Sequence, residues 1–230
     1  MVKRYLTGLF ILLVMHVHAQ QKEYRVINFS SRDGLASNSV NAIIKDHDGF
    51  MWFASDNGVN RFDGQQFTTY RHKENDSTSI GTGPVTTMTL DHTGRIWLAT
   101  NSTLSVYNRN QDAFHNYNLS SIGWIRSLYT DHRGRIWIGT YSGLYIFDPN
   151  TRRAKRLTKP ASVLPQPKSE IITCIFEDRQ KNIWLGTEEG LFFFSEKKRL
   201  LKKIMHETAH SQKGSDDVVG SITEDSNGHL

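Results

Sequence analysis

The sequence lacks the features that mark disulfide-rich, membrane-embedded and nucleotide-binding proteins. Its 230 residues contain one cysteine, Cys174, so no internal disulfide can hold the fold together. Beyond the N-terminal segment, no apolar run approaches the roughly 18 residues of a membrane span. No glycine-rich loop of the kind that cradles phosphates occurs either. The fold must therefore be stabilised by its own core.

Residues 1–19 differ from the rest and are interpreted as a secretory signal peptide. Lys3 and Arg4 precede an apolar run, Leu9–Met15, and the segment ends in a small-residue cleavage pattern at Val17–Ala19. An uncleaved N-terminal anchor is the alternative, although the apolar run is short for a span. Without Lys3 and Arg4 the formal charge falls from +5 to +3. That balance is too mild to indicate a nucleic-acid partner.

A ten-residue pattern that begins with aspartate recurs along the chain. The complete copies read DHDGFMWFAS, DHTGRIWLAT, DHRGRIWIGT and DRQKNIWLGT, and a shorter fifth copy reads DSNGHL. Their aspartates lie 45, 40, 47 and 47 residues apart and are Asp46, Asp91, Asp131, Asp178 and Asp225. A period of roughly 40 to 50 residues predicts an array of repeated supersecondary units.

The residues around each aspartate predict one unit of four strands. The positions six, four and three residues before each aspartate are β-branched, small and apolar, respectively. This order indicates an inner strand buried on both faces, with a narrow slot at the small residue where neighbouring strands leave no room for a large side chain. Cys174 occupies that slot in the fourth unit and is interpreted as structural. The turn after the aspartate calls for a positive φ, and its glycines are Gly49, Gly94, Gly134 and Gly228. The fourth unit has Lys181 there instead.

A tryptophan at a fixed place in the second strand predicts how the units pack. Each is expected to be buried between neighbouring sheets, and the four are Trp52, Trp97, Trp137 and Trp184. We therefore predict an all-β fold, a β-propeller in an open arc of about four four-stranded blades with an incomplete fifth. The units span residues 38–70, 84–117, 123–159, 170–206 and 217–230, within a propeller region of residues 20–230. A linear β-solenoid is the alternative, disfavoured by the repeat length.

The repeat also resembles a known family. Its pattern, D-x-x-G-x-[IM]-W-[IL]-G-T-x-x-G-L, closely resembles the two-component regulator propeller repeat, over nearly all of residues 24–230. Residues 29–55 are similar to the usual start of such a domain just after a signal peptide. The resemblance implies an exported, periplasmic sensor region of a hybrid two-component histidine kinase of Bacteroidetes type, one that typically senses oligosaccharides.

The same resemblance implies the partners. They are an oligosaccharide ligand and the remainder of the sensor chain, with further blades, a β-sandwich, a membrane anchor and the kinase. The full-length protein is expected to form a homodimer. This chain contains no kinase-type motif and looks like an N-terminal fragment, so it is expected to be neither an enzyme nor a cofactor carrier. Two alternatives stay open: a secreted, carbohydrate-active propeller enzyme, and a fragment with no activity of its own.

Three histidines in the same slot invite a metal hypothesis. His47, His92 and His132 each follow the repeated aspartate. Metal ligands must converge within about 2 Å of one ion, whereas equivalent turns of neighbouring blades are spread around a rim. No metal site is therefore expected. The aspartates are expected to accept hydrogen bonds from turn backbone.

A ligand is expected at the mouth of the channel, where residues that break the repeat gather. Trp124 offers a flat apolar face for a sugar ring, and Arg126 offers hydrogen-bond donors. An equally supported alternative is that Trp124 caps the core. The predicted ligand-binding set is Trp124, Arg126, Asn41, Tyr141, Asp56, Asn57, Asn101 and Glu188. A glycosidase would instead need two carboxylates roughly 5 to 10 Å apart.

Overall fold

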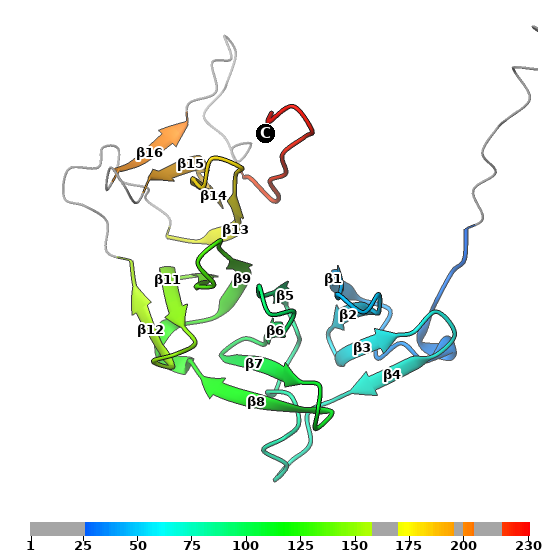
Figure 1. Cartoon of the computed structure of the whole chain (residues 1–230). Coiled ribbons are helices and arrows are strands. Elements are labelled where there is room, and N and C mark those ends of the chain that lie inside the picture. Colours follow the sequence, from blue (N-terminus) through cyan, green and yellow to red (C-terminus); the bar gives the residue numbers. More distant parts are fainter. Residues whose placement is uncertain (1–25, 158–169, 196–199, 205–217) are drawn as a thin grey trace, which may run out of the picture.

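Four separate sheets, placed side by side around an open arc, make up the computed structural model (Figure 1). It describes residues 26–157, 170–195, 200–204 and 218–230; the predicted signal peptide, residues 1–19, lies outside them. Every sheet is a four-stranded antiparallel meander, and residues 218–230 follow the fourth sheet without forming a strand. The predicted open propeller with an incomplete fifth blade is confirmed.

Within each blade the strands run in chain order from the inside of the arc outward (Figure 1). Blade 1 contains β1 (Val40–Lys45), β2 (Met51–Ser55), β3 (Gly58–Phe62) and β4 (Phe67–Tyr70). Blade 2 contains β5 (Thr87–Leu90), β6 (Ile96–Ala99), β7 (Thr103–Asn108) and β8 (Ala113–Asn118). Blade 3 contains β9 (Ile125–Thr130), β10 (Ile136–Thr140), β11 (Gly143–Asp148) and β12 (Arg153–Arg156). Blade 4 contains β13 (Ile172–Glu177), β14 (Ile183–Thr187), β15 (Gly190–Ser195) and β16 (Leu200–Ile204).

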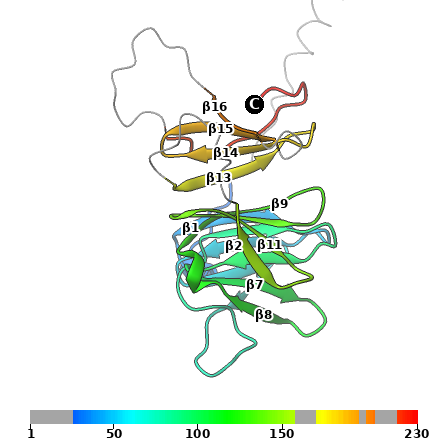
Figure 2. The same ribbon diagram turned by 90° about the vertical axis from the view of Figure 1, so that its left-hand side faces the viewer.

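The inner strands bring successive blades into contact. β1 contacts β5, β5 contacts β9, and β9 contacts β13. Seen from the side, the sheets of blades 3 and 4 lie one above the other (Figure 2). Two short 3₁₀ helices, η1 (Ser31–Asp33) and η2 (Ser120–Ile122), precede blades 1 and 3.

The repeated aspartate joins the inner turn to the tryptophan of the second strand. In blade 3, Asp131 Oδ1 accepts the backbone N–H groups of Arg133 and Arg135, each at 3.0 Å. Its Oδ2 accepts the indole Nε1–H of Trp137 at 2.8 Å. The same indole bond forms in the other three blades, at 2.8 to 2.9 Å. The sequence predicted the backbone bonds but not this bond to the tryptophan.

The turn glycines take the left-handed backbone that the sequence predicted. Gly94 and Gly134 have φ of +77° and +76°. Lys181, their counterpart in blade 4, adopts the same conformation at +67°. The turn therefore dictates its backbone geometry even where a side chain makes that geometry unfavourable.

Three of the four repeated tryptophans are buried between blades. Each rests edge-on against an aromatic ring of the next blade, in the pairs Trp52–Tyr107, Trp97–Phe147 and Trp137–Phe194, with centroids 4.9, 5.8 and 5.8 Å apart. Trp184 is only half-buried. The expectation of full burial is wrong for this residue because no sheet is formed by the described residues that follow blade 4.

The narrow slot of each inner strand lies beside a small residue of the second strand. Ala42 faces Ala54, and Cys174 faces Gly186. A Cβ atom added to Gly186 would overlap the Cys174 sulfur. Burial raises the pKa of the Cys174 thiol, which disfavours the reactive thiolate.

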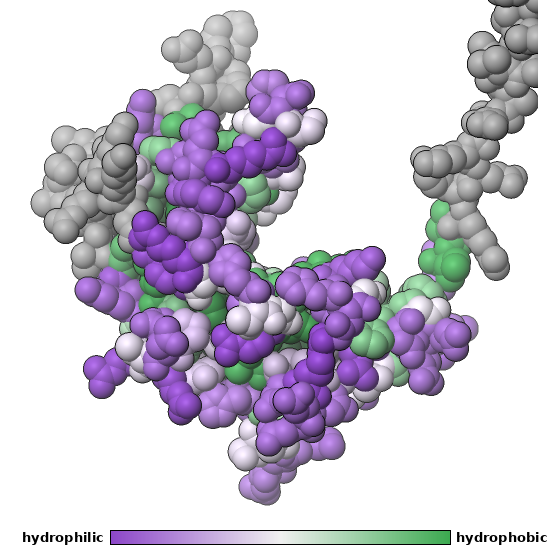
Figure 3. Space-filling view, viewed as in Figure 1, coloured by the Kyte–Doolittle hydropathy of each residue, from purple (hydrophilic) through white to green (hydrophobic). Residues whose placement is uncertain are grey.

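Hydrophobic surface concentrates along the inside of the arc and at the N-terminal segment in Figure 3. Val40 and Ile43 of β1 are exposed at the first end of the arc. Phe29, from the N-terminal segment, packs on Phe62 and Phe67 of blade 1.

Candidate functional site

Each blade presents two opposite ends, because its strands alternate in direction. We call one end the entrance face: it carries the starts of the inner strands and the turns between second and third strands, residues 56–57, 101–102, 141–142 and 188–189. The other end, the aspartate face, carries the repeated aspartate turns and the turns between third and fourth strands. The predicted ligand-binding residues all belong to the entrance face.

Three of those residues form a compact cluster on blade 3. The rings of Trp124 and Tyr141 stand at 90° with centroids 6.2 Å apart. Arg126 lies with its guanidinium carbon 5.3 Å from the centre of the Tyr141 ring and donates to the Tyr141 hydroxyl at 3.1 Å. Trp124 is 62% exposed and Tyr141 48%. Trp124 therefore does not cap the core.

A close backbone approach holds this cluster in place. Gly123 has φ of +84°, and a Cβ atom there would overlap the Ser142 hydroxyl. That hydroxyl donates to the Ile122 carbonyl at 3.2 Å, and the Tyr141 N–H donates to the Trp124 carbonyl at 3.2 Å. The loop that carries Trp124 is thus joined to the turn that carries Tyr141, and the two rings keep their relative position.

A second, polar pair lies on blade 1. Asn41 Nδ2 donates to Asp56 Oδ1 at 2.9 Å and to the Val85 carbonyl of blade 2 at 3.1 Å. Hydrogen bonds from Asn41 and then Ser39 lower the pKa of Asp56. Asp56 is therefore an anion at neutral pH, and both hydrogen bonds of the Asn41 side chain use its Nδ2 group.

Arg126 does not form the hydrogen bond to the following blade that residues at the same repeat position form in the other blades. Asn41 and Thr86 each donate to a backbone carbonyl of the following blade, those of Val85 and Ile125. Thr173 does the same with Val219. Arg126 instead turns to Tyr141, within its own blade. Three of the four polar residues at this position thus join blades.

The remaining predicted residues belong to neither cluster by hydrogen bonding. The Asn101 carbonyl accepts the Ile125 N–H at 2.9 Å, beside Trp124 in the chain. Asn57 and Glu188 are exposed on their turns, and neither side chain has a hydrogen-bond partner within the described residues. The structure brings Trp124, Arg126 and Tyr141 together and pairs Asn41 with Asp56, but leaves the other three dispersed.

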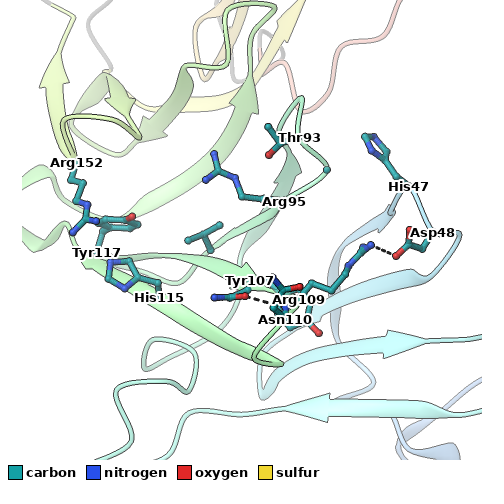
Figure 4. Close-up of a pocket in the computed structure, with 13 residues that line it drawn as sticks. His47, Asp48, Thr93, Arg95, Tyr107, Arg109, Asn110, His115, Tyr117 and Arg152 are labelled. Carbon is teal, nitrogen blue, oxygen red and sulfur yellow. Dashed lines mark hydrogen bonds and ion pairs between the residues drawn. The ribbon is translucent and has the colours of Figure 1, made fainter.

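A groove of about 760 Å³ opens on the aspartate face (Figure 4). Arg95, Arg109 and Arg152 line it, with Tyr107 and Tyr117. Arg109 pairs with Asp48, the one carboxylate among the lining residues, and lies 3.5 Å from Asp46 Oδ2. Sequence reasoning missed this groove because its residues come from several segments and only a comparison of blades in register relates them.

The repeated histidines contact the following blade. His92 Nε2 lies 2.6 Å from the Asp131 carbonyl oxygen, and His132 Nδ1 lies 2.5 Å from Glu177 Oε1. Among the residues that the structure describes, no three histidine, cysteine, aspartate or glutamate side chains gather as a metal site would require.

Comparisons with known proteins identify the repeat. Residues 34–57, 119–142 and 166–189 match the family described as two component regulator propeller. Histidine kinase P4 of Formosa agariphila is 39% identical over 72 residues, which are 31% of this chain and 5% of the kinase. Within the described ranges, no helix has the length and apolarity to cross a membrane.

Solved structures share the fold. The extracellular domain of BT4673 from B. thetaiotaomicron, described as a hybrid two component system, is 25% identical with a TM-score of 0.63, over 73% of this chain and 23% of that one. Virginiamycin B lyase from Staphylococcus aureus is 13% identical with a TM-score of 0.58, over 74% of this chain and 57% of the lyase. The chain thus spans only a small part of its sensor relatives. Three of its repeats match the model of the two component regulator propeller family.

Proposed function

We propose that this chain is part of the exported, ligand-sensing propeller of a two-component sensor, and that the cluster of Trp124, Arg126 and Tyr141 contacts an oligosaccharide. The matched repeats, the kinase relative and the extracellular BT4673 domain support the sensor role. The lyase likeness, at 13% identity, concerns the fold and gives no support to an enzymatic role.

The observation that carries the ligand class is the exposed right-angled corner of Trp124 and Tyr141. Aromatic faces of this kind offer apolar area to the C–H face of a sugar ring while remaining rigid. Arg126 has five N–H donors, and its bond to Tyr141 leaves most of them for hydroxyl groups. The cluster combines stacking surface and donors at the place where the blades converge.

Signal transfer would pass through the rest of the sensor chain. In this proposal the parent protein is anchored in the inner membrane, faces the periplasm with this propeller and places a kinase beyond it. A homodimer of the full-length sensor would then couple ligand occupancy to the kinase. Asn41, Asp56, Asn57, Asn101 and Glu188 would add polar contacts from the other blades.

The test measures oligosaccharide binding by the full-length sensor and by variants at the corner. Trp124→Ala and Arg126→Ala should each weaken binding of the inducing glycan by about tenfold, the size of a lost stacking or charged hydrogen-bond contact. Arg153→Ala, an exposed arginine on β12, is the matched control and should bind as the parent does. Unchanged binding in both variants, or weaker binding accompanied by a lower melting temperature, would contradict the assignment.

A further inference from the structure

The contact between blades 1 and 2, which we call the first seam, contains a carboxylate held by tyrosines. Asp112, in the turn between β7 and β8, accepts the Tyr70 hydroxyl at 2.6 Å and the Tyr107 hydroxyl at 2.5 Å. Arg61 of blade 1 lies 3.8 Å from the same carboxylate oxygen and donates to the Tyr107 hydroxyl at 3.0 Å. Tyr70 stacks on the buried Trp52, with ring centroids 5.7 Å apart. The first seam therefore satisfies its polar groups internally.

Strand register identifies the same positions in the second seam, between blades 2 and 3. Trp52 pairs with Arg61, and Trp97 pairs with Val106, so Val106 stands where Arg61 stands. Val59 pairs with Tyr70 in the first blade, and Leu104 pairs with Tyr117 in the second. Tyr117 thus corresponds to Tyr70, and it stacks on Trp97 in the same way, with centroids 5.9 Å apart.

The blade that follows each seam differs at two positions: blade 2 supplies them in the first seam and blade 3 in the second. Phe147, which meets Trp97, replaces Tyr107, which meets Trp52. Arg152 replaces Asp112: each directly precedes the first residue of its fourth strand, and each is left-handed, with φ of +56° and +49°. The second seam therefore has an arginine where the first has a carboxylate.

The groove of Figure 4 reaches these replaced positions. Val106 lines it in place of an arginine, and Arg95 also lines it, with its guanidinium carbon 5.5 Å from the centre of the Trp97 ring. Arg152 extends toward Tyr117 and His115 in the close-up (Figure 4). Within the described ranges, neither the Tyr117 hydroxyl nor the Arg152 guanidinium has a hydrogen-bond or ion-pair partner. The groove's one lining carboxylate, Asp48, is paired with Arg109.

We propose that the groove, at its end between Tyr117 of blade 2 and Arg152 of blade 3, binds the carboxylate of a carboxylate-bearing ligand. The Tyr117 hydroxyl and the Arg152 guanidinium donate to it, as the hydroxyl of Tyr70 does to Asp112. An arginine fork matches a carboxylate in a planar, bidentate geometry. The ring faces of Tyr117 and His115 supply contact area for the rest of the ligand. This site lies on the aspartate face and is separate from the oligosaccharide site proposed above.

The test titrates the whole chain with glucuronate, glucose and acetate by ligand-observed NMR. Glucuronate should bind saturably and glucose should not displace it. Acetate binding as tightly as glucuronate would assign the site to carboxylate alone, and tighter glucuronate binding would assign part of the contact to the ring; both results support the proposal. Displacement of glucuronate by glucose, or no glucuronate binding, would overturn it.

Variants separate this site from general surface charge. Arg152→Gln should weaken glucuronate binding by about tenfold or more, and Tyr117→Phe by about threefold to tenfold, the range for hydrogen bonds to a charged group. Arg153→Gln, the neighbouring exposed arginine, is the matched control and should remain within about twofold. Trp124→Ala should leave glucuronate binding unchanged, which keeps this result independent of the entrance face. Equal effects of Arg152→Gln and Arg153→Gln, or unaltered binding in Tyr117→Phe, would overturn the proposal.

Discussion

Blade 3 contains two tryptophans that differ in burial. Trp137 is completely buried, donates its indole N–H to Asp131 and lies edge-on to Phe194 of the next blade. Trp124, thirteen residues earlier, is mostly exposed and meets only Tyr141 among the described aromatic rings. Because the residue type is the same, the position in the repeat decides which tryptophan is buried and which is exposed.

The difference has a physical origin in the propeller geometry. Every seam requires a large apolar side chain between two sheets, and the repeat supplies one at a fixed place in each second strand. The strand entrance has no such requirement, because it faces the open end of the blade. Side chains at the strand entrance can therefore vary between blades. A large aromatic side chain that stays exposed there is unfavourable, because its apolar surface remains in contact with water, and such exposed surfaces often mark binding sites.

The largest expected effect comes from truncating each of these tryptophans. Trp137→Ala should lower the free energy of unfolding by about 3 to 5 kcal/mol, because it leaves a cavity between blades 3 and 4. Trp124→Ala should change it by less than about 0.5 kcal/mol, as surface substitutions do. Denaturant unfolding followed by circular dichroism measures both values. Similar losses in the two variants would contradict the distinction between the buried and the exposed tryptophan.

The aspartates of blades 3 and 1 extend the comparison to charge. Asp131 is buried, which raises its pKa, but bonds from Trp137 and Arg135 outweigh burial and lower the pKa below its ordinary value. A lowered folded-state pKa contributes stability above the unfolded value, near 3.9, and that stability is lost as pH falls through the folded value. Asp131→Asn should therefore cost about 2 to 3 kcal/mol at pH 7 and flatten the loss of stability below about pH 4.

Unfolding free energies of the parent and of Asp131→Asn, measured from neutral to acid pH, provide the readout. Asp56→Asn is the control, because Asp56 also has a lowered pKa but lies exposed on the entrance face. Its unfolding midpoint at pH 7 should match that of the parent. If the unfolding free energy of Asp131→Asn fell with acid pH as steeply as that of the parent, the Asp131 carboxylate would not be the group responsible for the acid loss of stability.

The smallest effect concerns the turn after the aspartate. Lys181 occupies a left-handed position that glycine fills in the other blades. Lys181→Gly removes the cost of that conformation, about 1 to 2 kcal/mol, but adds freedom to the unfolded chain, so a net stabilisation of about 0.5 kcal/mol is expected. Gly134→Ala makes the reverse change in blade 3 and should destabilise by about 1 kcal/mol. Thermal unfolding of both variants gives the measurement; destabilisation by Lys181→Gly would mean that its side chain contributes more than its backbone costs.

Much of the architecture could be predicted because every blade must satisfy the same packing requirements, so the same residue types recur at the same spacing. The slot occupied by Cys174, the positive φ at Gly94 and the burial of Trp97 each follow from a residue type that recurs at one spacing. Trp184 was mispredicted because its burial depends on a neighbouring sheet and not on its own blade. The cluster of Trp124, Arg126 and Tyr141 was within reach, since each residue departs from the pattern on the same face.

The sequence by itself determined the blade: strand order, turn conformation and the side chains committed to the seams, because these depend on local geometry and on a spacing that repeats. Only the tertiary structure decided what each seam contains. Asp112 and Arg152 are ordinary turn residues in the linear sequence. Their difference matters only across the blades, where Asp112 accepts the Tyr70 hydroxyl and Arg152 extends toward Tyr117 (Figure 4). The physical reason is that a seam is built from two blades at once, so its charge balance depends on residues that are tens of positions apart in the chain.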